Sequence, residues 1–343
     1  MKTLLYLPRH FRSVSHIIPP AVVTVEDYAR TFHMKIAPAR FSPPFKAESL
    51  RWMAVLALIC GVSFAGMKSP APEPAMSSAL LRAKYTELSE QLRDNQYKRP
   101  LYVKSVESSH HLKGEIYAVI NYPFAAVNLA LNNPAHWCDV LILHLNVKYC
   151  HAASNKAGTV LSVNLGRKYY QPLADTYRVE FNYRGVITTP DYFAVELNGE
   201  NGPLSTHDYR IWIEATPVND GRTFLHVTYA YAFDLAGYLA MQGYLATIGS
   251  DKVGFTIIGK QPDGQPVYIK GVRGVLERNT MRYYLAIDAY LAALTTPPKD
   301  QLEKRLQYWY DATDHYARQL HEVTRDEYLD MKRREYRRQQ VAQ

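Results

Sequence analysis

The sequence lacks the short motifs that mark common catalytic and nucleotide-binding sites. It contains no GxSxG, no Walker loop, no GxGxxG after a strand and no HExxH, so no residue is specified as a nucleophile or as a ligand of a catalytic metal. These absences leave enzymatic activity open but favour a protein that is not an enzyme. We therefore expect neither a cofactor nor a catalytic metal.

Cysteine is scarce, with only three in 343 residues, which excludes a disulfide-dense scaffold. Cys138 and Cys150 would close a short loop, and in an oxidising compartment we expect them to bond and to stabilise the fold by about 3 kcal/mol at most. Two free thiols remain an alternative. A metal site would need the neighbouring histidines His136, His144 or His151, but none of these spacings matches a CxxC or HxxxH pattern.

No apolar run in the sequence is long enough to span a bilayer, and the longest run indicates export. Residues 52–64, WMAVLALICGVSF, are too short for a helix that crosses a bilayer, which needs about 20 residues. Basic residues precede the run, and Ser63 and Ala65 supply the small side chains that a signal peptidase requires. We predict cleavage after Ala65 and a periplasmic or secreted protein. Translation from Met1 or from Met34 stays open, and a short buried helix is the alternative to a signal peptide.

Loss of residues 1–65 changes the charge balance. The formal net charge of the whole chain is +8, but 32 basic and 29 acidic residues remain after removal, a net charge of +3. A charge this small offers no electrostatic footprint for nucleic acid. The basic tail MKRREYRRQQ lies among acidic residues, so we expect a solvated helix there. Peripheral contact with a membrane stays open.

The remaining chain divides into three predicted regions. Residues 66–100 read as a Pro-rich linker followed by a helix, in which Leu81, Tyr85, Leu88 and Leu92 share one face. Residues 101–295 form the main domain, and residues 296–343 form a helical extension whose last helix opens with the capping box Thr324 and Glu327. We find no internal repeat.

The main domain alternates short helices with a run of strands. A strand at residues 114–120 precedes two short helices that begin near Pro123. Strands then follow at residues 159–165, 176–186, 192–197, 207–218 and 222–233, joined by tight turns that favour antiparallel neighbours. A helix at residues 234–247, a hairpin at residues 253–270 and a long helix at residues 271–294 complete the domain.

Alternation along the strands predicts two different faces of the sheet. Tyr177, Val179 and Phe181 alternate with charged neighbours, and the last strand repeats the pattern. One face should therefore cover the long helix, while the other face should meet water.

This order of elements resembles the START-like, or Bet v 1-type, helix-grip superfamily. The residues that carry the likeness are Gly114–Ile120, then Pro123, Phe124, Val127, Ala130, Leu131, Pro134 and Trp137, over roughly residues 105–295. The resemblance implies an α+β fold in which a curved antiparallel sheet grips a long helix, here with extra C-terminal helices. It also implies a cavity between sheet and helix for an apolar or amphipathic small molecule such as a lipid.

The chain is rich in tyrosine, with 27 in total, and tyrosine offers a cavity both apolar area and a polar tip. The candidate lining residues are Tyr177, Phe181, Tyr183, Tyr209, Ile211, Ile213, Tyr229, Tyr231, Arg282 and Tyr283. Arg282 would meet an anionic headgroup or would lie on a solvated flank of the helix. Binding or transfer of a small molecule is the favoured function, and the alternatives are a cyclase or hydrolase-like enzyme on the same fold and a structural or protein-interaction module with a filled core.

Overall fold

The computed structural model describes residues 77–156, 158–247 and 249–341. The predicted signal peptide, its cleavage site and most of the Pro-rich linker lie outside these residues. These described residues form one compact unit. No helix in the described ranges is long and apolar enough to cross a membrane.

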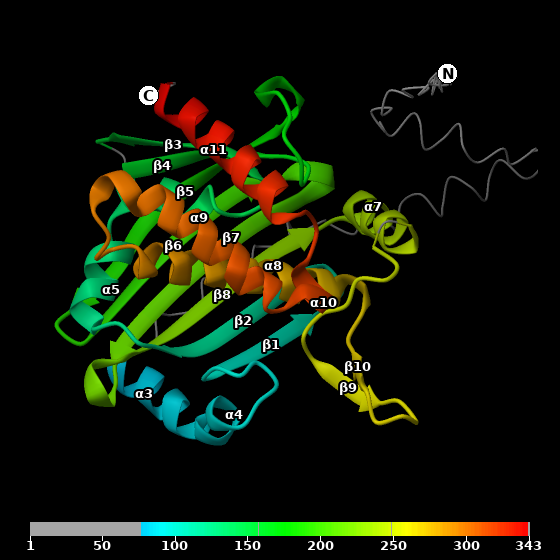
Figure 1. Ribbon diagram of the computed structural model, residues 1–343, viewed down its shortest axis with the longest axis horizontal. Helices are drawn as coiled ribbons and strands as arrows, with labels where there is room; N and C mark the ends of the chain where they lie inside the picture. The colour runs from blue at the N-terminus through cyan, green and yellow to red at the C-terminus, as the bar shows by residue number, and fades with distance from the viewer. Residues whose placement is uncertain (1–76, 157, 248, 342–343) are drawn as a thin grey trace, which may run out of the picture. The chain divides into compact units, whose positions relative to one another are not determined.

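One antiparallel sheet of eight strands dominates this unit (Figure 1). Its spatial order is β1-β2-β8-β7-β6-β5-β4-β3. The strands are β1 Leu101–Glu107, β2 His111–Ile120, β3 Val147–Asn155, β4 Gly158–Leu165, β5 Tyr177–Thr189, β6 Tyr192–Asn201, β7 Thr206–Pro217 and β8 Thr223–Phe233. A separate two-stranded hairpin, β9 Ile257–Lys260 with β10 Pro266–Tyr268, projects from one end. Strands β3 to β8 pair as a continuous meander. The tight turns in the sequence predicted the part of it from β5 to β8.

The helices form groups before, within and after the sheet. α3 Ser78–Glu87 and α4 Ser89–Arg93 precede it, α5 Phe124–Leu131 and α6 Trp137–Leu141 connect β2 to β3, and α7 Leu235–Ala246 follows β8. The long helix is α8 Gly271–Ala292, and α9 Pro298–Asp314, α10 Ala317–Leu320 and α11 Arg325–Val341 end the chain. The fold therefore has the predicted α+β architecture, a curved antiparallel sheet around a long helix with C-terminal additions.

The long helix packs against the inner face of the sheet. α8 contacts β1, β2 and β8 on one side and α9 on the other (Figure 1). β2 approaches α8 closely at Gly114, where an added Cβ would clash with the side chain of Thr280 on α8. Glycine is therefore required there by close approach rather than by backbone conformation.

The outer face of the sheet is not open to water as the alternation predicted. Leu81, Leu88 and Leu92 from α3 and α4 pack against a second apolar cluster on this face, which includes Trp212 and Phe224. The prediction was wrong for the central strands because the N-terminal helices cover them.

A buried polar cluster lies on the same outer face. His226 Nδ1 hydrogen-bonds to Glu214 Oε1 at 2.7 Å, and His226 Nε2 lies 3.2 Å from Glu115 Oε1. All three side chains are buried. Burial alone would lower the pKa of His226, but the hydrogen bonds to the two carboxylates raise it.

The C-terminal helix also departs from the prediction of a solvated segment. α11 contacts β3, and Tyr328, Lys332 and Glu335 are fully buried. Its first turn has the predicted capping box, in which the Thr324 backbone N–H donates to Glu327 at 2.8 Å. The buried face of α11 was not recognised in the sequence because two of its residues, Lys332 and Glu335, are charged.

Candidate functional site

The side chains predicted to line a cavity lie mostly between the sheet and α8. Phe181, Ile211, Ile213, Tyr209, Tyr229, Tyr231 and Tyr283 are all buried in the main core. Tyr183 is partly buried against the same core, whereas Tyr177 is 43% exposed at the start of β5. The structure therefore brings eight of the ten predicted residues to one region and leaves Tyr177 at the surface and Arg282 in an ion pair.

The tyrosines of this region pack against one another. The ring centroids of Tyr209 and Tyr231 are 5.3 Å apart and stacked, and those of Tyr229 and Tyr283 are 5.0 Å apart. Burial raises the pKa of each of these phenols, so all four are neutral at physiological pH. A guest between the sheet and α8 would have to displace these rings.

Arg282 is held by an internal carboxylate. Glu322, in the segment between α10 and α11, lies 2.9 Å from Arg282, 2.7 Å from Lys168 and 3.0 Å from Lys252. Burial would raise the pKa of Glu322, but Arg282 and Lys168 lower it to about 2. Neither of the two roles predicted for Arg282 is observed, because Glu322 takes the place of an external anion and the guanidinium is buried.

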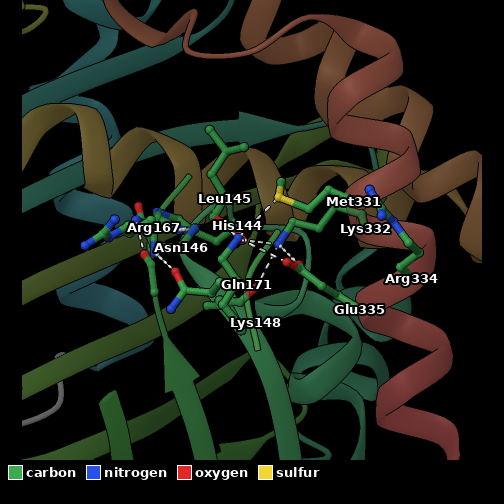
Figure 2. A network of polar contacts seen from close by, with 12 residues as sticks. His144, Leu145, Asn146, Lys148, Arg167, Gln171, Met331, Lys332, Arg334 and Glu335 are labelled. Carbon is green, nitrogen blue, oxygen red and sulfur yellow. Dashed lines mark hydrogen bonds and ion pairs between the residues drawn. The ribbon is translucent and has the colours of Figure 1, made fainter. Parts of the chain in front are cut away.

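A second buried charge network attaches α11 to the sheet (Figure 2). Lys332 donates to the carbonyl oxygens of His144 and Val147 at 2.7 Å each and to Glu335 at 2.8 Å. Lys148 lies 3.1 Å from the other oxygen of Glu335. All three charged side chains are 0% exposed, so two ammonium groups share one carboxylate away from water.

The cysteine pair strengthens the same region. Cys138 on α6 and Cys150 on β3 form a disulfide with a Cα–Cα distance of 5.2 Å. The predicted bond is confirmed, and the alternative of two free thiols is excluded. Within the described part of the chain, no group of three or more His, Cys, Asp or Glu side chains could hold a metal ion.

The structure also contains a hollow that the sequence did not indicate, which we call the Arg99–Asp288 pocket. It has a volume of about 570 Å³ and lies between the β1–β2 end of the sheet and helices α8 and α9. Its lining includes Lys98, Arg99, Tyr122, Asp288, Lys304, Tyr308 and Tyr316. Small-molecule sites commonly have volumes of about 300–1,000 Å³, so the pocket is large enough for an organic ligand.

An ionised pair forms one wall of this pocket. Asp288 on α8 is 3% exposed and accepts hydrogen bonds from Arg99 at 2.6 Å and from Tyr308 at 2.9 Å. Arg99 also donates to the hydroxyl of Tyr284 at 3.2 Å. Burial would lower the pKa of Arg99, but Tyr284 and Asp288 raise it, so the guanidinium stays charged. The pair fixes the positions of Arg99 and Tyr308.

The tyrosine walls of the pocket are ordered by similar contacts. Tyr316 donates its hydroxyl hydrogen to the carbonyl oxygen of Tyr97 at 3.0 Å, which connects the turn after α9 to the segment before β1. Burial raises the pKa of Tyr122 to about 12. The pocket thus combines neutral phenol groups with charged side chains.

Sequence reasoning missed this pocket because most of its lining comes from segments outside the strand pattern. Residues 98–100 precede β1, and residues 304–316 belong to α9 and the following turn. The available signal was the single acidic residue Asp288 within an otherwise apolar half of the long helix. A buried helical carboxylate needs a cationic partner, but the sequence does not identify Arg99 as that partner.

Comparisons with solved structures return distant matches. Ara h 8.0201 matches at 12% identity and a TM-score of 0.30, over 53% of this chain and 97% of that chain. Human StAR-related lipid transfer protein 5 matches at 8% identity and 0.25, over 46% and 85%, and truncated norcoclaurine synthase from Thalictrum flavum at 12% and 0.27, over 42% and 94%. No protein-family model and no curated protein matches the chain.

The helix-grip fold that the resemblance to the START-like, Bet v 1-type superfamily implied is confirmed. The assignment rests on the order of the elements themselves: β2, two short helices, the antiparallel strands β3 to β8 and the long helix α8 over their inner face. The matches are too distant to assign a ligand, which has to be inferred from the side chains of this chain.

Proposed function

We propose that this protein binds an amphipathic small molecule in the Arg99–Asp288 pocket. The observation that carries the proposal is a hollow of about 570 Å³ that joins three tyrosine side chains to an ion pair between the partly exposed Arg99 and the buried Asp288. Ligand sites typically have apolar and aromatic walls and a small number of polar groups that point toward the ligand. A binding role fits the helix-grip fold and requires no catalytic motif.

The pocket supports binding better than the interior beneath α8 does. The interior tyrosines contact one another, so binding there would cost their mutual packing as well as the ordering of a ligand. The Arg99–Asp288 pocket is already formed. A ligand there would contact the rings of Tyr122, Tyr308 and Tyr316 without moving the core.

Ligand binding can be tested with a substitution that fills the pocket. Ala312 lines the pocket and is only partly exposed, so Ala312→Phe should occupy its volume. We would measure thermal unfolding with decanoate, decanol, cholate and lysophosphatidylcholine, since a ligand that binds only the folded state raises the midpoint. Native mass spectrometry of the purified protein would detect a molecule that is already bound.

The expected result is that at least one compound stabilises the original protein and that Ala312→Phe removes the effect. Ala79→Phe is the matched control, because Ala79 is exposed on α3 and does not line the pocket. Equal stabilisation of Ala312→Phe would place the ligand elsewhere. No stabilisation by any compound, together with no co-purifying molecule, would refute the proposed function.

We also propose that the chain is exported, with cleavage after Ala65. The apolar run of residues 52–64 and the small residues Ser63 and Ala65 support this proposal. Amino-terminal sequencing of the protein from its native source should return Gly66 as the first residue. A chain that still contains residues 52–64 would refute it.

Peripheral membrane contact is a second candidate role, which we propose from α7. This helix has no charged residue, and it exposes Leu235 by 71% and Leu239 by 60% beside Leu204, which is 68% exposed. Co-sedimentation with neutral phosphatidylcholine vesicles tests it. Leu235→Glu with Leu239→Glu should abolish binding, while Leu129→Glu, at a 75% exposed position on α5, should not. Equal binding by all variants would refute the role.

A further inference from the structure

We infer that the molecule in the Arg99–Asp288 pocket carries an anionic group, which Lys98 and Lys304 bind at the rim. The inference rests on the proposed function and adds the chemical class of the ligand. It follows from the charges around the pocket and from how each charge is already paired.

The acidic side chains of the pocket are already paired with cations. Asp288 accepts from Arg99 at 2.6 Å, and Asp311 lies 3.4 Å from Arg325 on α11. A cationic ligand would have to compete with these two arginines. The pocket therefore has no unpaired carboxylate among these two for a cationic ligand to bind.

Two basic side chains of the pocket are in the opposite situation. Lys98 and Lys304 line the pocket, both are exposed, and among the described residues neither ammonium group has an ion pair or a hydrogen bond. Both lysines are therefore available to an external anion. Neighbouring His315 lines the same region and could add a further donor.

The backbone at Lys98 supports a role for this residue. Lys98 has a φ of 56°, a left-handed conformation that is uncommon for residues other than glycine. The segment is held on both sides, by Tyr316, which donates to Tyr97, and by Arg99, which pairs with Asp288. Such conformations persist where surrounding contacts impose them, and they cluster at ligand sites. Here they direct two consecutive basic residues to one pocket.

The shape of the pocket places the charged end of the ligand at the rim and its body among the rings. Lys98 and Lys304 are exposed, whereas Tyr308 is partly buried and Tyr316 is buried. A carboxylate or a phosphate could occupy the rim, since both bind ammonium groups through the same charge-assisted hydrogen bonds. The ligand class is an organic anion with an apolar or aromatic body.

The test compares three probes with one body and different charges: 4-phenylbutyrate, 4-phenylbutanol and 4-phenylbutylamine. Isothermal titration calorimetry would measure their dissociation constants with the full exported chain. We expect the acid to bind about tenfold more tightly than the alcohol, which corresponds to about 1.4 kcal/mol. The amine should bind most weakly. A comparison of 4-phenylbutyl phosphate with inorganic phosphate would show whether the pocket binds an anionic group only when it is attached to an apolar body or also binds the free anion.

Substitutions then identify the lysines as the source of the preference. Lys98→Gln with Lys304→Gln should reduce the preference for the acid to less than threefold and should weaken its salt dependence, because exposed charges are screened by salt. Lys299→Gln is the control, since Lys299 is an exposed lysine at the start of α9 outside the pocket. This control should leave the preference unchanged.

The outcomes separate this inference from the proposed function. Equal binding of acid and alcohol, or an unchanged preference in the double variant, overturns the anion inference while leaving a pocket that binds small molecules. Tighter binding of the amine overturns it as well. Failure of the acid while a neutral compound stabilises the protein and loses its effect in Ala312→Phe again overturns only the inference. Failure of every compound overturns both.

Discussion

The buried network of Lys148, Lys332 and Glu335 predicts opposite effects for two substitutions of similar size. Glu335→Gln removes the single carboxylate and leaves two ammonium groups fully buried without a counterion (Figure 2). Lys148→Met removes one of the two cations and keeps the Lys332–Glu335 pair, with its distance of 2.8 Å. The variants therefore change the net charge of the network in opposite directions.

The expected magnitudes follow from the cost of a buried charge. Removing one partner of a buried ion pair typically costs about 3–5 kcal/mol, whereas replacing a charged group by an apolar one of similar volume is often neutral or stabilising. Glu335→Gln should lower the free energy of unfolding by about 3–5 kcal/mol. Lys148→Met should lower the free energy of unfolding by less than about 1 kcal/mol or should raise it. The Lys148 side chain already contacts the sulfur of Met331, and a methionine side chain can pack against it there.

The same network predicts how stability depends on pH. Burial and neighbouring Lys332 lower the pKa of Lys148 from its ordinary value of 10.5 to about 7. Between these two values the unfolded chain binds a proton that the folded chain releases, so the free energy of unfolding rises with pH by up to about 1.4 kcal/mol per unit. Below pH 7 both states bind the proton, and this slope disappears.

Urea unfolding followed by circular dichroism at pH 6, 7, 8 and 9 measures both effects. Other groups with shifted pKa values, such as Lys168, contribute to every curve, so the difference between the original protein and Lys148→Met isolates Lys148. We expect the original protein to gain more stability than Lys148→Met between pH 7 and pH 9. Parallel curves for the two proteins would refute the titration argument. A Glu335→Gln variant as stable as the original would refute the burial argument.

Three further predictions concern other parts of the fold. Cys138→Ala with Cys150→Ala should cost about 2–3 kcal/mol in urea unfolding, because the disulfide spans 12 positions and closes a short loop, and an unchanged midpoint would contradict this. The pKa of His226 is raised in the folded state, so its protonation stabilises the fold below pH 6.5, and this stabilisation is lost as the pH rises through the folded pKa. His226→Gln should remove this loss, and equal pH profiles of stability for the two proteins would refute the prediction. Gly114→Ala should destabilise the protein by about 1–3 kcal/mol through overpacking against α8, whereas Gly259→Ala, which has open space around its Cβ position, should not, and similar melting temperatures for the two would refute the close approach.

The sequence predicted most of the sheet because each strand has a local signal. Strands β4 to β8 have alternating side chains and explicit turns, and their ends lie within a few residues of the prediction. The long helix α8 was found from its stripe of apolar residues. The disulfide was predicted from the pair of cysteines that remains after the expected signal peptide, in an oxidising compartment, and the capping box at Thr324 was found from two residues alone.

The missed elements have weak local signals and depend on tertiary partners. β1 follows Pro100 and pairs with β2 residue by residue, from Leu101 opposite Ala118 to Glu107 opposite Leu112. β3 lies in the stretch read as the disulfide loop. In both strands the partner strand, rather than the local pattern, decides the structure. The buried face of α11 was concealed because Lys332 and Glu335 are charged, and charged residues are almost never fully buried unless they are paired.

The position of the candidate site follows from how additions surround the helix-grip core. Asp288 and Tyr122 belong to the segment that matches the expected core, whereas Lys98, Arg99, Lys304 and Tyr316 belong to segments before and after it. The N-terminal segment and the C-terminal helices meet beside α8, and the pocket is the space that they enclose with the end of β2. The core interior is packed with tyrosines, while the polar groups free to bind a ligand are on the additions. Under the proposed function, the ligand therefore binds beside α8 at the additions rather than beneath it in the core, and the residues outside the core are the ones whose substitution should change what this protein binds.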